Sequence, residues 1–397
     1  MTTPGAVFAT FLKYGTHPRP LVRPMQPIPL LIPPFIFVGD VPVPGLTSPR
    51  ERSVEIVPTP MNGSQKATVK TSQVVDATRR TSLPWGVGDW ELVQFLADSE
   101  QSEVFAARPR GDGTHTVCEY VVKVLRETLA DDPAAVARFH REVCAGGKVN
   151  HKHLMPVVEA HLAAATDEIP SYLVMPLVAG STLDRTLLAE RALGWGQACW
   201  FARQTAQALG YLHAEGWLHA DVKPANILVS ADGHVTLLDL GFLQPLAETR
   251  LPRDRATSQS GLAPQDGPAP AAVLGTLKYV APEMLVRTTG VTAASDIYSL
   301  GVVLFESLAG SHPFAEACEE QAMLRWEDVQ SRLVEAHRAT VPVDVRQFAP
   351  AVPVELAELV QAMLAKDPLR RPANMSQVVG QLTSLEFAAL RQSRVCA

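Results

Sequence analysis

The stretch that decides the fold covers residues 219–226, which read His-Ala-Asp-Val-Lys-Pro-Ala-Asn, and Asp-Leu-Gly follows at residues 239–241. Between the two, residues 227–229 (Ile-Leu-Val) predict a strand, and residues 235–238 (Val-Thr-Leu-Leu) predict a second strand that returns beside it. The intervening Ala-Asp-Gly at 231–233 is typical of a turn, because glycine tolerates a positive φ. The sequence therefore predicts a hairpin that brings the two polar stretches together.

The polar side chains at the ends of this hairpin suggest a metal-dependent reaction. We expect Asp221, Asn226 and Asp239 to face one cleft. Oxygen ligands of this kind suit Mg²⁺, which usually takes one or two carboxylates and completes its shell with water and phosphate. A carboxylate that is not on the metal can accept a proton from a hydroxyl nucleophile. A solvated Asp/Asn loop is the alternative interpretation, and the joint spacing of these residues argues against it.

The pattern His-x-Asp-x-Lys-Pro-x-Asn followed by Asp-x-Gly resembles the catalytic and metal-binding loops of eukaryotic-like serine/threonine protein kinases. The resemblance covers about residues 88 to 388. It implies an α+β, bilobal fold with a small antiparallel-sheet lobe at about 88–178 and a larger helical lobe at about 179–388. The small lobe would hold five strands and one helix, with ATP in the cleft between the lobes. The implied reaction transfers the ATP γ-phosphoryl group to serine or threonine hydroxyls of a protein substrate.

The resemblance also implies a role for each polar residue of the central stretch. Asp221 would be the catalytic base, and Lys223 would stabilise the transferring phosphoryl group. Asn226 and Asp239 would bind Mg²⁺. His219 would brace the loop as a structural residue. Ala220 replaces the arginine that usually binds an activation-loop phosphate, which suggests an activity not gated in that way.

Two further residues of the small lobe match the catalytic pattern. Residues 120–124 predict an apolar strand whose single lysine, Lys123, would clamp the ATP phosphates. Residues 131–143 predict a helix that starts with an Asp cap and a proline in its first turn. Glu142 on this helix would pair with Lys123 and orient its amine.

The expected adenine site depends on alignment alone. Met175 would lie behind the adenine as the gatekeeper, and the backbone of the hinge would recognise its edge. The residues assigned to nucleotide contact in this part of the chain are Leu96, Val104, Met175, Pro176 and Val178.

The turn between the first two strands departs from the family pattern. The three glycines that let backbone N–H groups approach the phosphates are replaced by Ala97, Ser99 and Ser102. Glu100 and Glu103 add negative charge near the expected phosphates. A pseudokinase that acts as a nucleotide-sensing or scaffolding module is therefore an alternative. A small-molecule kinase of the aminoglycoside or choline type is another, and Lys223 argues against it.

Further residues of the large lobe extend the resemblance, and one of its helices can be predicted from periodicity. Thr276 resembles the residue that accompanies Lys223 in enzymes specific for serine and threonine. Glu283 should form an internal ion pair with Arg371, and Asp296 should brace the backbone of the catalytic loop. Residues 195–216 predict a helix that ends at a capping glycine.

Composition limits the other possibilities. The 397 residues carry a net charge of −6, so no basic surface predicts nucleic-acid binding. Five cysteines are scattered without metal spacing, which favours reduced thiols and a soluble, cytoplasmic protein. We expect no membrane span, because no window of about 18 apolar residues lacks breakers. Residues 1–84 hold fourteen of the 32 prolines and predict an extended or disordered segment, either a plain tail or an arm that docks a partner.

Overall fold

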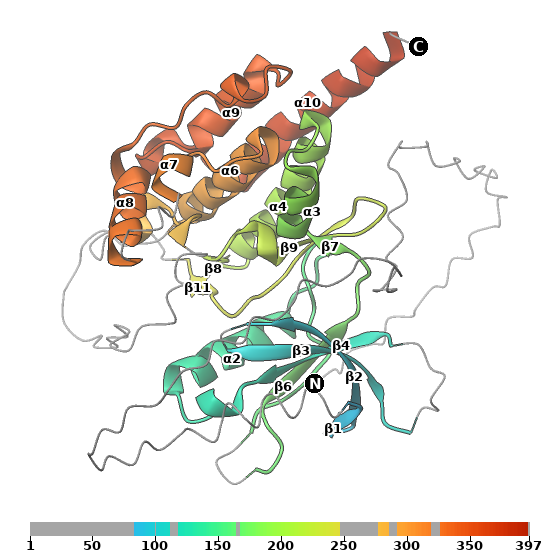
Figure 1. Ribbon diagram of the computed structural model, residues 1–397. Helices are drawn as coiled ribbons and strands as arrows, with labels where there is room; N and C mark the ends of the chain where they lie inside the picture. Colours follow the sequence, from blue (N-terminus) through green and yellow to red (C-terminus); the bar gives the residue numbers. More distant parts are fainter. Residues whose placement is uncertain are drawn as a thin grey trace, which may run out of the picture. The chain divides into compact units, whose positions relative to one another are not determined.

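The computed structural model describes residues 83–99, 101–111, 118–163, 167–246, 277–285, 292–318 and 326–395. These residues form the predicted bilobal α+β fold, with an antiparallel sheet and one long helix in the small lobe and several helices in the large lobe (Figure 1). The predictions for Glu100, Thr276 and residues 1–82 lie outside the described residues.

The small-lobe sheet has six strands, one more than expected, in the order β1-β2-β3-β4-β6-β5. The extra strand is β1, which pairs with β2 across a turn where Gly88 has a φ of +53°. Its three residues are too few to show an alternating pattern in the sequence. The strands are β1 (Trp85–Val87), β2 (Trp90–Asp98), β3 (Ser102–Pro109), β4 (Tyr120–Leu125), β5 (Glu159–His161) and β6 (Tyr172–Pro176).

The alternation of β4 decides where its lysine points. Val122 and Val124 are buried in an apolar cluster on one face of the sheet, together with side chains of β2, β3 and β6. Leu125 is buried in a separate cluster with residues of the following helix. Because successive side chains of a strand point to opposite faces, Lys123 lies on the same face as Leu125 and faces that helix.

The helix on this face is α2 (Pro133–Gly146), and it starts as the sequence predicts. The side chain of Asp132 accepts a hydrogen bond from the Ala134 N–H, and Pro133 occupies the first turn. Ala135, Phe139, Glu142 and Gly146 are buried at spacings of three and four residues. This stripe packs Phe139 against the sheet and carries Glu142 inward with it.

The central hairpin forms with the predicted turn. Strand β9 (Ile227–Val229) pairs with β10 (Val235–Leu237), and Gly233 in the turn has a φ of +78°. Strand β7 (Ser181–Thr182) pairs with the other edge of β9. A second small pairing joins β8 (Trp217–Leu218) to β11 (Gln244–Pro245), on either side of the catalytic loop and the Asp-Leu-Gly motif.

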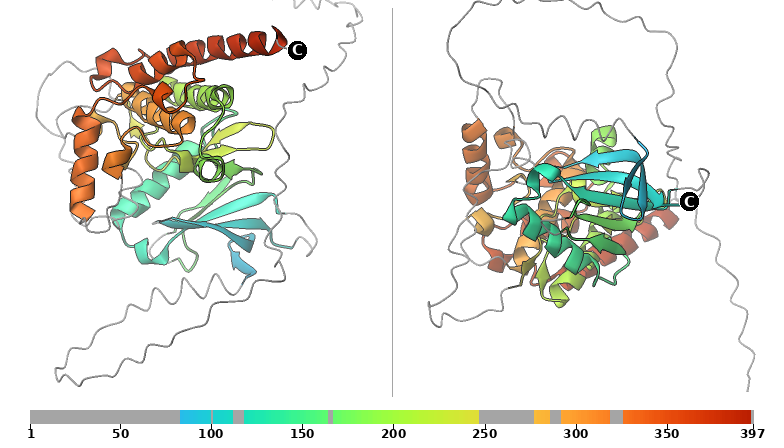
Figure 2. Two further views of the ribbon diagram at one scale, coloured as in Figure 1. Left: turned by 45° about the horizontal axis from the view of Figure 1, so that its top comes forward. Right: turned by 90° about the horizontal axis from the view of Figure 1, so that it is seen from below.

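The large lobe is built on a helical core in which α4 contacts both α6 and α10 (Figure 2). Helix α4 ends at Ala214, and Gly216 follows with a φ of +79°, close to the predicted capping position. The helices are α3 (Leu183–Glu190), α4 (Trp195–Ala214), α6 (Ala293–Ala309), α7 (Ala315–Cys318), α8 (Trp326–Ala339), α9 (Val354–Met363) and α10 (Met375–Val395). Helix α10 extends seven residues past the expected end at 388.

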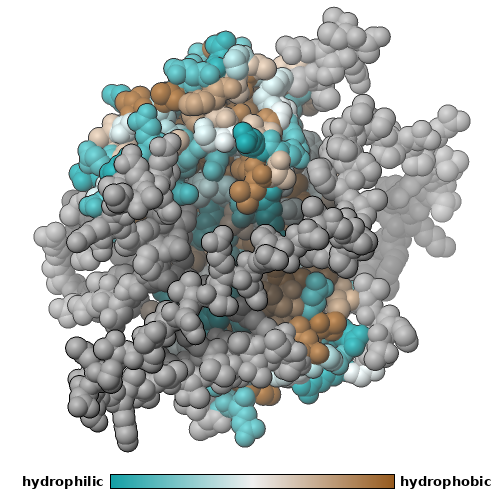
Figure 3. Space-filling model, in the orientation of Figure 1, coloured by the Kyte–Doolittle hydropathy of each residue, from teal (hydrophilic) through white to brown (hydrophobic). Residues whose placement is uncertain are grey.

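The surface offers no simple guide to function. On the side shown in Figure 3, polar and apolar residues of the described part are interspersed. Single exposed apolar side chains, such as Leu188 and Leu369, are normal for a folded protein. Among the described residues, no helix has both the length and the apolar character needed to cross a membrane. The thiols of Cys118, Cys144 and Cys199 are free.

Candidate active site

Lys123 and Glu142 form a buried ion pair on the inner face of the sheet. The Lys123 Nζ donates to the Glu142 Oε1 at 2.8 Å and to its Oε2 at 2.7 Å. Burial raises the pKa of Glu142 to about 7, although Lys123 opposes the shift. For Lys123, burial favours the neutral amine, but the carboxylates of Asp239 and Glu142 outweigh it and raise the pKa of Lys123. The amine is therefore charged and held between two carboxylates.

Asp239 stands at the end of the central hairpin in a left-handed backbone conformation, with a φ of +59°. Its Oδ1 accepts a hydrogen bond from the Gly241 N–H at 3.1 Å and lies 3.6 Å from the Lys123 Nζ. Burial disfavours its charge, but Lys123 and the Gly241 N–H hold the pKa of Asp239 below its usual range. Asp239 is thus an ionised carboxylate directed at Lys123.

Asp221 is buried in the catalytic loop, where two side chains hold its carboxylate. Asn226 Nδ2 donates to the Asp221 Oδ2 at 2.9 Å and to the Asp221 backbone carbonyl at 2.8 Å. The Lys223 Nζ lies 2.8 Å from the same Oδ2. Burial raises the pKa of Asp221, and Lys223 opposes this shift. The amide nitrogen of Asn226 is thus used internally, while its oxygen is not committed to these bonds.

Asp296 of α6 holds the loop backbone, which confirms the bracing role expected of it. Its carboxylate accepts hydrogen bonds from the His219 and Ala220 N–H groups, both at 2.9 Å. Ala220 has a φ of +61°, a left-handed conformation that costs a non-glycine residue about 1 kcal/mol. His219 accepts from the Asp221 N–H through Nδ1, which leaves Nε2–H to donate to the Leu238 carbonyl at 3.1 Å. The catalytic loop is therefore tied directly to the residue that precedes Asp239.

The predicted ion pair between Glu283 and Arg371 also forms. Arg371 donates to both carboxylate oxygens of Glu283, at 2.6 and 2.8 Å, and both side chains are buried. Burial disfavours the carboxylate, but the guanidinium holds the pKa of Glu283 below its usual range. The pair fastens the 3-10 turn at Pro282–Leu285 to the segment that precedes α10.

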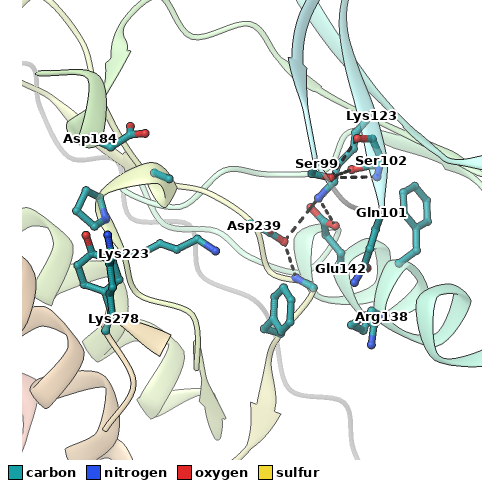
Figure 4. A pocket seen from close by; sticks show the side chains of 16 residues that line it. Ser99, Gln101, Ser102, Lys123, Arg138, Glu142, Asp184, Lys223, Asp239 and Lys278 are labelled. Carbon is teal, nitrogen blue, oxygen red and sulfur yellow. Dashed lines mark hydrogen bonds and ion pairs between the residues drawn. The ribbon is translucent and has the colours of Figure 1, made fainter. Parts of the chain in front are cut away.

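A cavity of about 390 Å³ is lined by charged residues of the site (Figure 4). Lys123 and Glu142 lie on one side of it, Lys223 on the other, and Asp239 between them. The predicted base Asp221 and the predicted ligand Asn226 are not part of the cavity lining. Asp221 contacts the lining residue Lys223, and Asn226 donates a hydrogen bond to Asp221. The cavity lining does not include the five residues predicted to contact adenine.

Four of those five residues lie on strands of the small-lobe sheet, with Leu96 on β2, Val104 on β3, and Met175 and Pro176 on β6, while Val178 follows the end of β6. Val104 is the cross-strand neighbour of Lys123, and Leu96 precedes Ala97, which pairs with Val104. Met175 pairs with Val121. After β6, the Leu177 N–H donates to the Glu119 carbonyl at 2.8 Å. Since backbone groups alternate in direction along a strand, the carbonyl of Pro176 at the end of β6 is directed away from β4. The contact of all five residues with a nucleotide stays a prediction.

Sequence reasoning missed three charged residues that line the cavity: Arg138, Asp184 and Lys278. Arg138 stands one helical turn before Glu142, so the α2 periodicity could have revealed it. Asp184 lies in the first turn of α3, and Lys278 lies in a segment pinned by the His312 side chain, which hydrogen-bonds the Lys278 carbonyl at 2.7 Å. No local pattern in the sequence marks these two residues.

The turn between β2 and β3 closes without glycine. The Ser99 N–H donates to the Ser102 carbonyl at 2.9 Å, and the Ser102 N–H donates to the Ser99 Oγ at 3.0 Å. The two hydroxyls are 2.8 Å apart. Ala97, Ser99 and Ser102, which stand at the expected glycine positions, do not have positive φ values, so their backbone conformations do not require glycine. Serine side chains supply bonds that close the turn.

The family model for the protein kinase domain matches residues 95–382. The chain belongs to the protein kinase family. Serine/threonine-protein kinase PknB of Mycobacterium leprae is 32% identical over 282 residues, which cover 71% of this chain and 40% of that protein. PknB of Mycobacterium tuberculosis is 35% identical over 225 residues, 57% of this chain and 33% of the relative.

Other kinases of the family match over a similar span. Serine/threonine-protein kinase PknA of Mycobacterium tuberculosis is 29% identical over 285 residues, 72% of this chain and 58% of that protein. The aligned part thus spans only 33–58% of the length of these relatives.

The residues at the end of the hairpin suit Mg²⁺ by their chemistry. Asp239 offers an ionised carboxylate and Asn226 an amide oxygen, the hard oxygen donors that this ion prefers. The described residues hold no cluster of three or more His, Cys, Asp or Glu side chains arranged for a metal. A metal here would therefore depend on phosphate and water for the rest of its shell.

Proposed function

We propose that this chain is a serine/threonine protein kinase that transfers the γ-phosphoryl group of Mg·ATP to a hydroxyl of a protein substrate. The observation that carries the proposal is the convergence of Lys123, Glu142, Lys223 and Asp239 on one cavity, with Asp221 bonded to Lys223 behind them. A module without catalysis needs none of these charges, which are buried or partly buried and therefore cost free energy to desolvate. Membership of the protein kinase family and the names of the curated relatives support the same reaction.

We assign the chemical steps to the residues that the site brings together. Asp221 accepts the proton of the substrate hydroxyl, and burial helps this role because it makes the carboxylate more basic. Lys223 moves from Asp221 to the transferring phosphoryl group and offsets its charge. Lys123, held by Glu142, binds the ATP phosphates. With these roles, catalysis depends mainly on positioning the reactants and stabilising negative charge.

Asn226 and Asp239 would hold the metal through their side-chain oxygens. Mg²⁺ bound there would offset the charge on the phosphates and orient them for in-line transfer. The Lys123 Nζ, 3.6 Å from the Asp239 Oδ1, would keep that carboxylate ionised and aimed at the cleft. Leu96, Val104 and Met175 would contact the adenine, with the Pro176 carbonyl and the Val178 N–H at its edge.

A transfer assay tests the proposal. Wild type, Lys123→Met and Asp239→Asn are each incubated with labelled ATP and Mg²⁺, alone and with a basic acceptor protein. We expect label on serine or threonine with wild type and none with either variant. Binding of Mg·ATP without transfer would contradict the kinase assignment and favour a nucleotide-sensing module.

The partners follow from the same proposal. The substrate is a protein with an accessible serine or threonine, and Lys223 is the residue that favours this choice over tyrosine. A docking role for the proline-rich residues 1–84 and a cytoplasmic location stay predictions.

A further inference from the structure

One side of the cavity is formed by residues of the large lobe, and we call Asp184, Lys223, Lys278 and Tyr279 the large-lobe wall. Asp184, Lys223 and Lys278 lie on that side, away from Lys123 (Figure 4). Asp184 stands in the first turn of α3, and this helix contacts the short turn that follows Lys223. Asp184 therefore borders the part of the cavity that the proposed function assigns to the protein substrate.

The carboxylate of Asp184 has an unsatisfied oxygen. Within the described part of the chain, its Oδ1 is buried and accepts no hydrogen bond. A buried acceptor without a donor destabilises a fold, so such an atom calls for an explanation. Negative charge in the first turn of a helix is favourable, but this interaction does not supply the missing donor. Because a carboxylate shares its charge between two oxygens, a cation that reaches the group through the cavity would offset it.

A second carboxylate, Glu306 of α6, lies behind this wall. Its Oε2 accepts a hydrogen bond from the Tyr279 hydroxyl at 2.7 Å. Burial raises the pKa of Glu306; Tyr279 and Lys278 oppose this shift, and the charge of Asp184 adds to it. Asp184 and Glu306 are thus close enough to repel each other, and Lys278 is close enough to attract Glu306.

The described cations of the large-lobe wall do not offset both carboxylates. The Lys223 amine lies 2.8 Å from the Asp221 Oδ2 and offsets the charge of that buried group. Lys278 is a single cation beside the pair of carboxylates, Asp184 and Glu306. Among the described residues, the wall is therefore one positive charge short, which favours a substrate that brings a cation.

We propose that Asp184 is a specificity-determining residue that binds a lysine or arginine side chain of the protein substrate close to the acceptor hydroxyl. The inference rests on the proposed function, because it takes this cavity as the place where a serine or threonine meets ATP. Asp184 and Lys223 line one cavity, and an extended chain advances about 3.3 Å per residue. The basic side chain should therefore lie within about three residues of the acceptor.

A positional peptide library tests the inference with the full chain. Each peptide carries one serine or threonine acceptor, and arginine, alanine or glutamate is placed in turn at the three positions on either side. For wild type we expect arginine to raise kcat/KM about tenfold over alanine at one position, the size of a hydrogen bond between charged groups. Asp184→Asn should reduce this ratio to below about twofold. Asp184→Lys should favour glutamate over arginine at the same position.

The library also separates recognition of the substrate from a structural role of Asp184. In Asp184→Asn, kcat/KM for the alanine peptide and KM for ATP should match wild type. Glu190→Gln is the matched control, because Glu190 is an exposed carboxylate at the other end of α3, and this variant should keep the arginine preference. Equal losses for the arginine and alanine peptides in Asp184→Asn would overturn the inference. An arginine preference that survives in Asp184→Asn, or a wild type that prefers glutamate, would also overturn it.

Transfer and preference keep this inference separate from the proposed function. Wild type that phosphorylates the library without any arginine preference would overturn the role of Asp184 and leave the kinase assignment intact. Wild type that binds Mg·ATP but labels neither the library nor the basic acceptor protein would refute the kinase assignment, and this inference with it.

Discussion

Replacing Glu142 by glutamine tests the electrostatics of the buried ion pair. The carboxylate gives Lys123 two short bonds, at 2.7 and 2.8 Å, and the amide can accept only one. Lys123 should then shift toward Asp239, which is already 3.6 Å from it, and compete with the metal. A lost hydrogen bond between charged groups costs about 1.5–3 kcal/mol. That cost corresponds to a fall in kcat/KM for ATP of about 10- to 150-fold at pH 8.

The pKa of Glu142 gives this prediction a second, independent signature. Burial raises that pKa to about 7, so the carboxylate is charged at pH 8 and largely neutral at pH 6. In wild type, kcat/KM should therefore fall as the pH drops through 7, because the protonated side chain holds Lys123 less well. The glutamine variant has no such group to titrate. The ratio of the wild-type kcat/KM to that of the glutamine variant should shrink toward 1 at pH 6.

Steady-state kinetics at varied ATP between pH 6 and 8 provide the assay. The melting temperature should change little, because the Lys123 amine keeps the Asp239 carboxylate as a partner and is not left as an unpaired buried charge. Glu355→Gln on the exposed face of α9 is the isosteric control and should match wild type throughout. If the ratio of the two kcat/KM values stays constant with pH, Glu142 is not the group whose titration lowers the wild-type activity. Unchanged kinetics at pH 8 would refute the role of the pair.

Two further predictions concern the supports of the site. Arg371→Met leaves the Glu283 carboxylate buried without its cation and should cost about 3–5 kcal/mol, about 10 °C in the melting temperature at pH 7. Because Arg371 holds the pKa of Glu283 low, the deficit should shrink at pH 5, and calorimetry showing an equal loss at both values would contradict this. Asp296→Asn weakens the hold on the left-handed Ala220 and should lower kcat about tenfold with little change in KM for ATP. Unchanged kcat in that variant would show that the loop keeps its shape without the carboxylate.

The central hairpin and the bracing contacts could be predicted because their signals are local or fixed in spacing. The turn glycine Gly233 and the apolar runs on either side of it specify β9 and β10 without help from the rest of the chain. The Asp132 cap and the buried stripe of α2 are likewise specified by residues within one short segment of the sequence. The partner of Glu283 lies 88 residues away, and only the motif order of the family pointed to Arg371.

Other features depend on contacts that no local pattern records. Strand β1 has three residues, too few for a period, and is defined by its pairing with β2. The sequence shows that glycine is absent between β2 and β3, but it does not show that Ser99 and Ser102 close the turn through their side chains. From the sequence alone, Arg126 is recognisable only as a charged residue that follows a predicted strand. Its contacts with the turn appear only when β3 and β4 are in register.

The most direct test of the account is a single-turnover measurement of phosphoryl transfer by Asp221→Asn, paired with its affinity for Mg·ATP. The Asp221 side chain accepts bonds from Lys223 and Asn226 and is not assigned to nucleotide contact, so nucleotide binding should stay within about threefold of wild type. Transfer to serine or threonine should fall by about 10²–10⁴-fold, the usual contribution of a positioned base. Transfer at the wild-type rate, with binding intact, would show that Asp221 is not the catalytic base and that the site does not work as described.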